Sequence, residues 1–367
     1  MKPKCISASP ETPLNPLEGL IIEYDILQEC PMTCLNRGED DLPKTAFIGG
    51  VTRARMSSQC IKRAVRIESR KHGAGLAIRT KKLPLLLTEA CVARGADREQ
   101  AGRCAEIISD NLSPNTVLCI SRAEVETLAD YAVSRDCSIA VDSKGKVSQT
   151  ELTKMGNCLS PEKTIKEGFD MVLFGRMTAH AHHADIRGAA HFAHVISTHA
   201  CNTELDYFTA MDDLETGKMC AHIGEHGFSS PLYYRYVGLN LGRLWQNLGG
   251  RDVDEAVRIF TVSLYLAVPE GRQSSMSGAF QWDYARVRIR KGQPMQVSFM
   301  TPVQCDMEGG YMKSSKKVLN AALRRKENVS GDYYGLLASY TFGEDESFTI
   351  DDLADRLADF VRARQAV

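Results

Sequence analysis

Residues 53–71 read RARMSSQCIKRAVRIESRK. Ser57 and Ser58 can cap a helix that runs to about Lys71. The residues expected to face the core recur at helical spacing: Ile61, Ala64 and Val65. A second face of the same helix carries basic side chains four residues apart: Lys62, Arg66 and Arg70. The pattern predicts an amphipathic helix with a strongly basic surface.

The charge around this helix is concentrated. Residues 44–82 hold eleven Lys and Arg and one acid, Glu68, so the segment carries 11 − 1 = +10, whereas the whole chain carries −1. A helix N-terminus favours acids, yet Arg53 and Arg55 precede this one and Lys62 and Arg63 stand in its first turns. Serine hydroxyls, free backbone N–H groups and guanidinium groups together form a cradle for phosphate. The alternative is a solvated basic helix that binds nothing.

The composition is that of an ordinary globular chain. The 367 residues are 43% apolar and 25% charged, which is enough to bury a large core. Residues 1–16 are polar and rich in proline and are expected to form a disordered lead-in without a signal peptide. No apolar run is long enough to span a membrane. The twelve cysteines form no CxxC pair, so we expect a reducing cytoplasm rather than disulfides or zinc.

The remaining segments predict an α+β fold with insertions. Residues 19–28 are expected to form a strand, and residues 75–160 an inserted block of helices ended by polar, glycine-containing stretches. Further along, the predicted elements are a buried strand at 170–176, a helix at 188–200, a glycine-rich hairpin at 205–240, a helix at 252–268 and strands at 282–290 and 295–300. Without the insertions, this order suits a ferredoxin-like sheet with helices on one side.

The strand at 282–290 alternates between apolar residues and a basic face. That face carries Tyr284, Arg286, Arg288 and Arg290. It could extend the phosphate-binding surface, with Tyr284 stacking on bases. It could equally be an outward-facing strand whose charges prevent edge pairing. The sequence leaves both interpretations open.

Metal chemistry is an alternative that the sequence does not favour. Six of the nine histidines lie between His180 and His199. The first three are in a loop-like stretch, and His191, His194 and His199 do not share one helical face. His222-Ile-Gly-Glu-His226 matches a metalloprotease pattern, but Gly224 and Gly227 argue against the helix that this chemistry needs. The pair Asp212-Asp213 could hold a metal or form a turn. We expect neither a metal nor a cofactor.

Several segments together resemble the CasC family, the backbone subunit of the type I-E CRISPR Cascade effector. They occur in family order over about residues 19–300: Leu35-Asn-Arg37, Lys44-Thr-Ala-Phe-Ile-Gly-Gly50, Arg53-Ala-Arg-Met-Ser-Ser-Gln59, Lys62-Arg63-Ala, Phe174-Gly-Arg-Met177, Ala193-His-Val-Ile-Ser-Thr-His199, Asp206-Tyr-Phe-Thr-Ala-Met-Asp-Asp213, Phe228-Ser-Ser230, Tyr234-Arg-Tyr236 and Asn247-Leu-Gly-Gly250. Each motif alone is weak, and the set is specific. The family has adjacent basic residues after the double glycine, whereas this chain has Val51-Thr52-Arg53.

The resemblance implies a right-hand-shaped subunit with an RRM-like palm, helical fingers and a β-hairpin thumb. The expected division is a lead-in at 1–16, palm at 17–74, 166–203 and 239–310, fingers at 75–165, thumb at 204–238 and a C-terminal segment at 311–367. Copies would stack head to tail along a guide RNA, because heterologous contacts of this kind produce open filaments.

The resemblance also implies which residues meet the guide. Contacts to its backbone would come from Arg37, Lys44, Ser57, Gln59, Lys62 and Arg63, with Arg53, Arg55 and Arg66 as additions. Met177, Phe208 and Thr209 would wedge where the strand kinks. Lysines of the fingers could touch DNA: Lys144, Lys146 and Lys154.

The expected function is therefore a non-catalytic scaffold in a cytoplasmic antiviral ribonucleoprotein. Its partners would be guide RNA, target DNA, further copies of itself and other Cascade subunits, with no membrane. Sequence specificity would come from base pairing rather than from side chains. A metal-dependent ribonuclease using Asp212, Asp213 or the histidines is the alternative.

Overall fold

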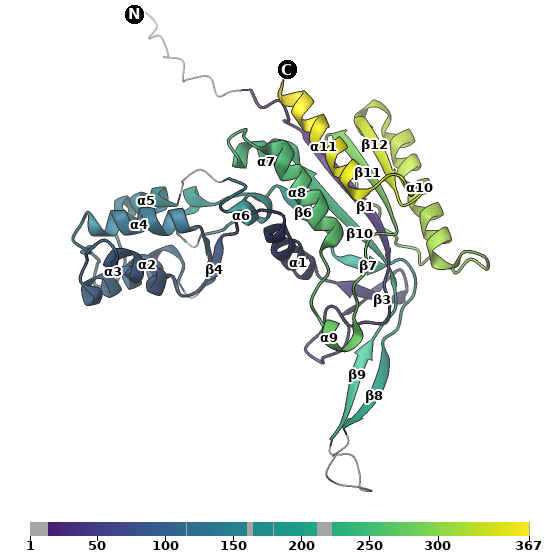
Figure 1. The fold of residues 1–367 in the computed structure, drawn as a ribbon, viewed down its shortest axis with the longest axis horizontal. Coiled ribbons are helices and arrows are strands. Elements are labelled where there is room, and N and C mark those ends of the chain that lie inside the picture. Colours follow the sequence, from purple (N-terminus) through teal and green to yellow (C-terminus); the bar gives the residue numbers. More distant parts are fainter. Residues whose placement is uncertain (1–13, 115, 160–163, 179, 211–221, 367) are drawn as a thin grey trace, which may run out of the picture.

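An antiparallel sheet forms the centre of the molecule (Figure 1). The computed structural model describes residues 14–366, except 115, 160–163, 179 and 211–221. Within these residues the sheet has eight strands in the order β12-β11-β1-β10-β7-β3-β2, with β6 beside β10. The strands are β1 (Leu20–Glu29), β2 (Thr45–Ile48), β3 (Val51–Met56), β6 (Ala190–Phe192), β7 (Val195–Ser197), β10 (Leu232–Asn240), β11 (Tyr284–Lys291) and β12 (Leu336–Phe342). Segments far apart in sequence therefore meet in one layer.

Helices cover both faces of this sheet. The larger core lies under α1 (Ser58–Lys71), α6 (Phe169–Phe174), α7 (Leu241–Asn247), α8 (Val253–Leu266) and α11 (Ile350–Gln365). The other face packs against α10 (Gly310–Ser330) and the segment 297–303. The sequence predicted helices on one side only, because the tail that supplies α10 carries no recognisable motif.

A separate helical lobe extends from one side of the sheet layer (Figure 1). It contains α2 (Leu83–Val92), α3 (Arg98–Leu112), α4 (Arg122–Val133), α5 (Gln149–Cys158) and the short strands β4 (Ile78–Thr80) and β5 (Leu118–Ile120). Leu, Ala, Ile and Cys side chains give the lobe a hydrophobic core of its own. A buried ion pair joins it to the body, since Arg176 Nη1 lies 2.6 Å from Glu124 Oε1 of α4.

A two-stranded hairpin projects in another direction (Figure 1). It pairs β8 (Glu204–Ala210) with β9 (His222–Phe228). Leu205, Tyr207 and Ile223 are each more than half exposed on it. Residues 232–238, predicted as part of the hairpin, instead belong to β10, which pairs with β1 in the middle of the sheet. The tyrosines of that segment are buried, which explains why an aromatic, glycine-rich pattern misplaced the boundary.

Three further predictions about local structure are wrong, each for a physical reason. Residues 169–174 form α6 rather than a strand, and the burial of Phe169–Leu173 removes the periodicity that would have marked a helix. Residues 188–200 form β6 and β7, since they pair with β10 and β3. Residues 295–300 form no strand, because side chains satisfy the backbone: the N–H of Met295 donates to Glu23 Oε1 and that of Val297 to the Tyr234 hydroxyl.

The short helix α9 (Gln273–Met276) lies beside the base of the hairpin (Figure 1). Single 3₁₀ turns occur at His182–Ala184 and Gly331–Tyr334. Across the part of the chain that the structure describes, no helix combines the length and the apolar character that a membrane crossing requires.

Candidate nucleic-acid interface

The first turn of α1 has the predicted cap. Ser57 Oγ accepts a hydrogen bond from the N–H of Cys60 at 3.3 Å, and the N–H of Ser57 donates to Asn36 Oδ1 at 2.8 Å. No acid stands in this first turn. The loop before β2 is thereby fixed against the helix start, and the positive end of the helix dipole is left without a carboxylate from its own first turn.

Four candidate residues reach the surface around this helix start. Gln59 and Arg63 are exposed, and Lys44 and Lys62 are half-buried. Arg63 is 65% exposed at its side chain and lies 3.2 Å from Glu270, an exposed pair worth little in water. Lys62 Nζ lies 5.8 Å from the centre of the Phe192 ring, and burial lowers its pKa. These side chains can exchange their weak contacts for a phosphate oxygen.

Arg53 is not part of this surface, which corrects its place among the predicted contacts. Its side chain is completely buried, Nε donating to Ser197 O at 2.7 Å and Nη2 to Phe299 O at 3.1 Å. Burial also lowers the pKa of this guanidinium. Arg53 joins β3, β7 and the segment on the far side of the sheet, and cannot reach a strand at the surface without unfolding them.

Two other predicted contacts are engaged within the chain. Arg66 Nε lies 2.5 Å from Asp170 Oδ2, and Nη2 donates to Ala77 O at 2.6 Å, so this side chain ties α1 to α6. Arg55 Nη1 lies 3.2 Å from His194 Nδ1. Both side chains are half-buried, but Arg66 is held by a carboxylate and a backbone carbonyl, whereas Arg55 faces a neutral or weakly basic ring.

The base of the hairpin is held by a chain of polar contacts. The rings of Phe208 and His226 stack with centres 4.3 Å apart. His226 Nε2 lies 3.0 Å from Arg272 Nη1, and Arg272 Nη2 donates to Asp41 Oδ2 at 2.7 Å. Asp41 also pairs with Arg37. This series of contacts joins the hairpin to the loop before β2. No motif in the sequence had pointed to this role for Arg272.

The other predicted wedge residues are exposed. Thr209 follows Phe208 on the hairpin, and Met177 is 80% exposed directly after the buried Arg176. Met177 follows α6 next to the lobe, whereas the hairpin projects away from the sheet (Figure 1). One copy of the chain thus carries its wedge candidates at two different places.

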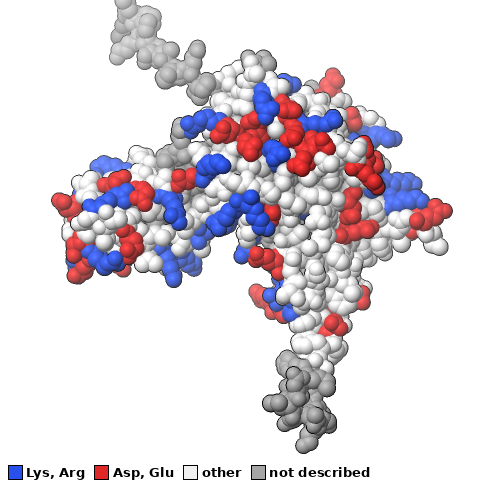
Figure 2. All heavy atoms as spheres, in the orientation of Figure 1, with Lys and Arg blue, Asp and Glu red and all other residues white. Residues whose placement is uncertain are grey.

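Exposed cations also gather where the lobe meets the sheet layer (Figure 2). The last turn of α1 and the connection to α2 carry exposed basic residues to which the sequence assigned no individual role: Arg70 and Lys71 in α1, and Arg79, Lys81 and Lys82 in the connection. The net charge of +10 over residues 44–82 was the sequence signal for these residues. The candidate DNA contacts of the lobe are exposed as well, and Lys154 Nζ lies 3.3 Å from Glu151; the others are Lys144 and Lys146.

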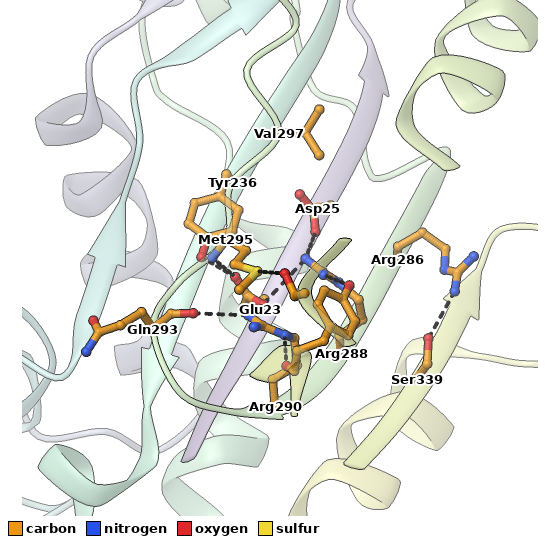
Figure 3. A network of polar contacts seen from close by, with 12 residues as sticks. Glu23, Asp25, Tyr236, Arg286, Arg288, Arg290, Gln293, Met295, Val297 and Ser339 are labelled. Carbon is orange, nitrogen blue, oxygen red and sulfur yellow. Dashed lines mark hydrogen bonds and ion pairs between the residues drawn. The ribbon is translucent and has the colours of Figure 1, made fainter. Parts of the chain in front are cut away.

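Two of the three arginines on the basic face of β11 match neither of its two interpretations. Arg288 and Arg290 are buried and pair with acids of β1: Arg288 Nη2 lies 2.6 Å from Asp25 Oδ2, and Arg290 Nη1 lies 2.6 Å from Glu23 Oε2 (Figure 3). Glu23 and Asp25 alternate with apolar residues in β1. That alternation was a sequence signal for a charged partner strand.

The described residues do not assemble the alternative metal chemistry. The segment His222–His226 is part of strand β9, whereas the metalloprotease pattern requires a helix. Among the residues that the structure describes, no three His, Cys, Asp or Glu side chains are placed to hold one metal ion. Asp212 and Asp213 lie outside the described residues.

Nearly the whole chain is similar to known proteins. A family model described as CT1975-like protein matches residues 22–359. No curated protein matches. A solved chain described as "CRISPR RNA-guided surveillance complex, pre-nicking" superposes with a TM-score of 0.74 at 23% identity, covering 94% of this chain and 100% of that one. Another, described as "CRISPR RNA-guided surveillance complex", has a TM-score of 0.58 at 21% identity and coverage of 94% and 99%. The fold is therefore shared with both chains.

Proposed function

This chain belongs to the CT1975-like protein family, and from that membership we propose that it is a guide-RNA-binding backbone subunit of a CRISPR surveillance complex. The observation that carries the proposal is the family match over residues 22–359. The motif resemblance adds a finer assignment, the type I-E Cascade, with an RRM-like palm, helical fingers and a hairpin thumb.

In this proposal the guide strand lies across the start of α1. Lys44, Lys62 and Arg63 neutralise its phosphates, and Gln59 and the N-terminal N–H groups add hydrogen bonds. All of these groups bind the sugar-phosphate backbone, which is the same for every sequence. The bases are left free to pair with target DNA, so pairing supplies the specificity.

Neighbouring copies complete the site. Phe208 and Thr209 of one copy, and Met177 of another, would separate successive segments of the guide, because each copy carries these side chains at two different places. Repetition of such a contact gives a filament whose length follows that of the RNA. The exposed lysines of the lobe and the basic residues beside it face the space where target DNA would lie.

The test is purification of the full-length chain with guide RNAs of two lengths. We expect particles whose mass increases with RNA length, and nuclease protection along the whole guide. The Lys62→Ala/Arg63→Ala variant should lose both properties for every RNA sequence. Particles of constant mass, or a defect limited to some sequences, would reject the backbone role.

The proposed role is binding rather than catalysis. Incubation of the assembled complex with complementary RNA and a divalent metal separates the two. Cleavage that disappears in an Asp212→Ala variant would replace the scaffold with a ribonuclease, whereas intact RNA agrees with the proposal.

A further inference from the structure

Three arginines of β11 point to one face of the sheet, beneath α10. Their partners are on the adjacent strand β1, where Glu23 faces Arg288 and Asp25 faces Arg286 across the ladder. The two acids and three bases leave one positive charge in excess, 3 − 2 = +1. Glu23, Asp25, Arg288 and Arg290 are buried, whereas Arg286 is half-buried. Because burying an unpaired charge is costly, the excess charge is expected at the half-buried position.

The two carboxylates already have partners at each oxygen. Glu23 Oε2 meets Arg290 and Arg288 at 2.6 and 3.5 Å, and its Oε1 accepts from the Tyr236 hydroxyl at 2.6 Å. Asp25 Oδ2 meets Arg288 at 2.6 Å, and its Oδ1 accepts from the Tyr234 hydroxyl at 2.6 Å. Every oxygen of both acids is thus already engaged, and neither acid pairs with the third arginine.

That third arginine is Arg286, which lies apart from the network in Figure 3. Its Nη1 donates to Asn320 Oδ1 and its Nη2 to Ser339 Oγ, both at 3.0 Å. Its Nε is buried without a hydrogen-bond partner, as is that of Arg288. Among the described residues, no carboxylate lies within ion-pair distance of Arg286. Two neutral oxygens therefore hold a guanidinium whose charge is not balanced.

Arg286 and Arg288 line a cavity of about 380 Å³ between β11, α10 and the residues before and along β12. Tyr284 and Tyr334 contribute aromatic walls, and Arg324 of α10 lines it as well. Glu327 and Glu344 also line the cavity, and both are exposed, as Arg324 is. This volume lies in the range of small-ligand sites, most of which hold a few convergent polar groups.

We propose that this cavity binds a small phosphate group, either inorganic phosphate or the phosphate of a mononucleotide. A planar guanidinium fork suits a group with several anionic oxygens, and a doubly charged phosphate uses the excess charge of Arg286 together with Arg324 better than a single carboxylate does. The tyrosines leave room for a base or sugar beside the phosphate. The site lies on the opposite face of the sheet from α1 and does not depend on the role proposed for that helix.

Titration calorimetry on the nucleic-acid-free, full-length chain tests this site with inorganic phosphate, adenosine 5′-monophosphate and adenosine. We expect the two phosphate compounds to bind and Arg286→Gln to weaken them roughly tenfold or more, the loss typical of a charge-assisted hydrogen bond. Arg286→Lys should weaken them less, because it keeps the charge and loses the fork. Circular dichroism checks that both variants are folded.

The matched control is Arg325→Gln, on α10 but outside the lining of the cavity, which should bind as the original chain does. Glu344→Gln should bind tighter, since it removes a competing carboxylate. Equal affinities for phosphate and the mononucleotide identify the phosphate alone as the ligand, and tighter mononucleotide binding identifies a nucleotide site. Absence of binding, equal binding by folded Arg286→Gln, or adenosine binding as tightly as its monophosphate would overturn the proposal.

Discussion

Mutation of the surface cations of the basic segment should weaken RNA binding, whereas mutation of its buried arginine should weaken the fold. The triple variant Lys44→Gln/Lys62→Gln/Arg63→Gln removes three cations that reach the surface around the start of α1. Removing one phosphate-binding cation from a single-strand site lowers the salt slope of binding, log K against log salt, by about 0.7, so the slope of the triple variant should fall by about 2 units. Raising the salt from 50 to 200 mM should therefore weaken RNA binding by the triple variant roughly 15- to 20-fold less than binding by the original chain.

The contrasting variant is Arg53→Gln. Its guanidinium donates to two buried carbonyl groups, of Ser197 and Phe299, and touches no solvent. Its loss should destabilise the fold by about 2 kcal/mol, because the carbonyls lose their donors. The salt slope of RNA binding should stay that of the original chain.

The assay is fluorescence anisotropy with two single-stranded RNAs of unrelated sequence, at four salt concentrations. Urea unfolding of each variant supplies the stability measurement. The reasoning is refuted if folded Arg53→Gln lowers the slope as much as Arg63→Gln does, or if the triple variant leaves the slope unchanged. A slope that falls for one RNA and not for the other would contradict phosphate binding.

Three further outcomes follow from the interactions described above. Asp25→Asn should lower the free energy of unfolding by about 3–5 kcal/mol, because the buried Arg288 and Arg290 then share the single carboxylate of Glu23. Urea unfolding measures this, and a loss no larger than that of the exposed control Asp345→Asn would contradict it. Burial lowers the pKa of His199 from 6.5, and its Nε2 accepts from the N–H of Leu232, so the unfolded chain takes up the proton first and stability should fall as pH drops below about 6.5. The urea midpoint at pH 7.5 and 5.5 should show this, and His199→Gln should reduce the difference; an unchanged difference would refute the assignment. Arg272→Gln should release His226 and make the hairpin several-fold more sensitive to limited proteolysis than Arg325→Gln does; equal cleavage rates would show that the Arg272–His226 pair does not hold the hairpin.

Local signals predicted the element that carries the candidate site. The cap at Ser57 and the apolar spacing of Ile61, Ala64 and Val65 lie within one stretch of chain, so the sequence alone specifies α1. Elements whose structure depends on contacts with residues far away in the sequence were predicted wrongly. The segment 295–300 forms no strand because side chains of β1 and β10 accept hydrogen bonds from its backbone N–H groups. The helix α6 has no exposed polar face, because Phe169–Leu173 are buried.

The same distinction applies to the site. Charge counting located the basic segment, but it could not separate Arg63, which stays exposed, from Arg53, whose partners are residues 197 and 299. The alternating charges of β1 and β11 are a sequence signal that these two strands are neighbours. Acids at alternate positions of one strand and arginines at alternate positions of another fit together only if the two strands are adjacent and their charged faces are covered.

The separate core of the helical lobe affects how the stability of this protein can be followed. Its two tryptophans, Trp245 and Trp282, both pack in or against the main core, and the lobe core contains neither. Indole emission therefore monitors melting of the sheet layer alone, while far-ultraviolet ellipticity sums both parts. A lobe that melts first would pass unnoticed in a fluorescence scan and would appear as an early step in the ellipticity, so a single transition temperature from one probe does not describe the whole chain.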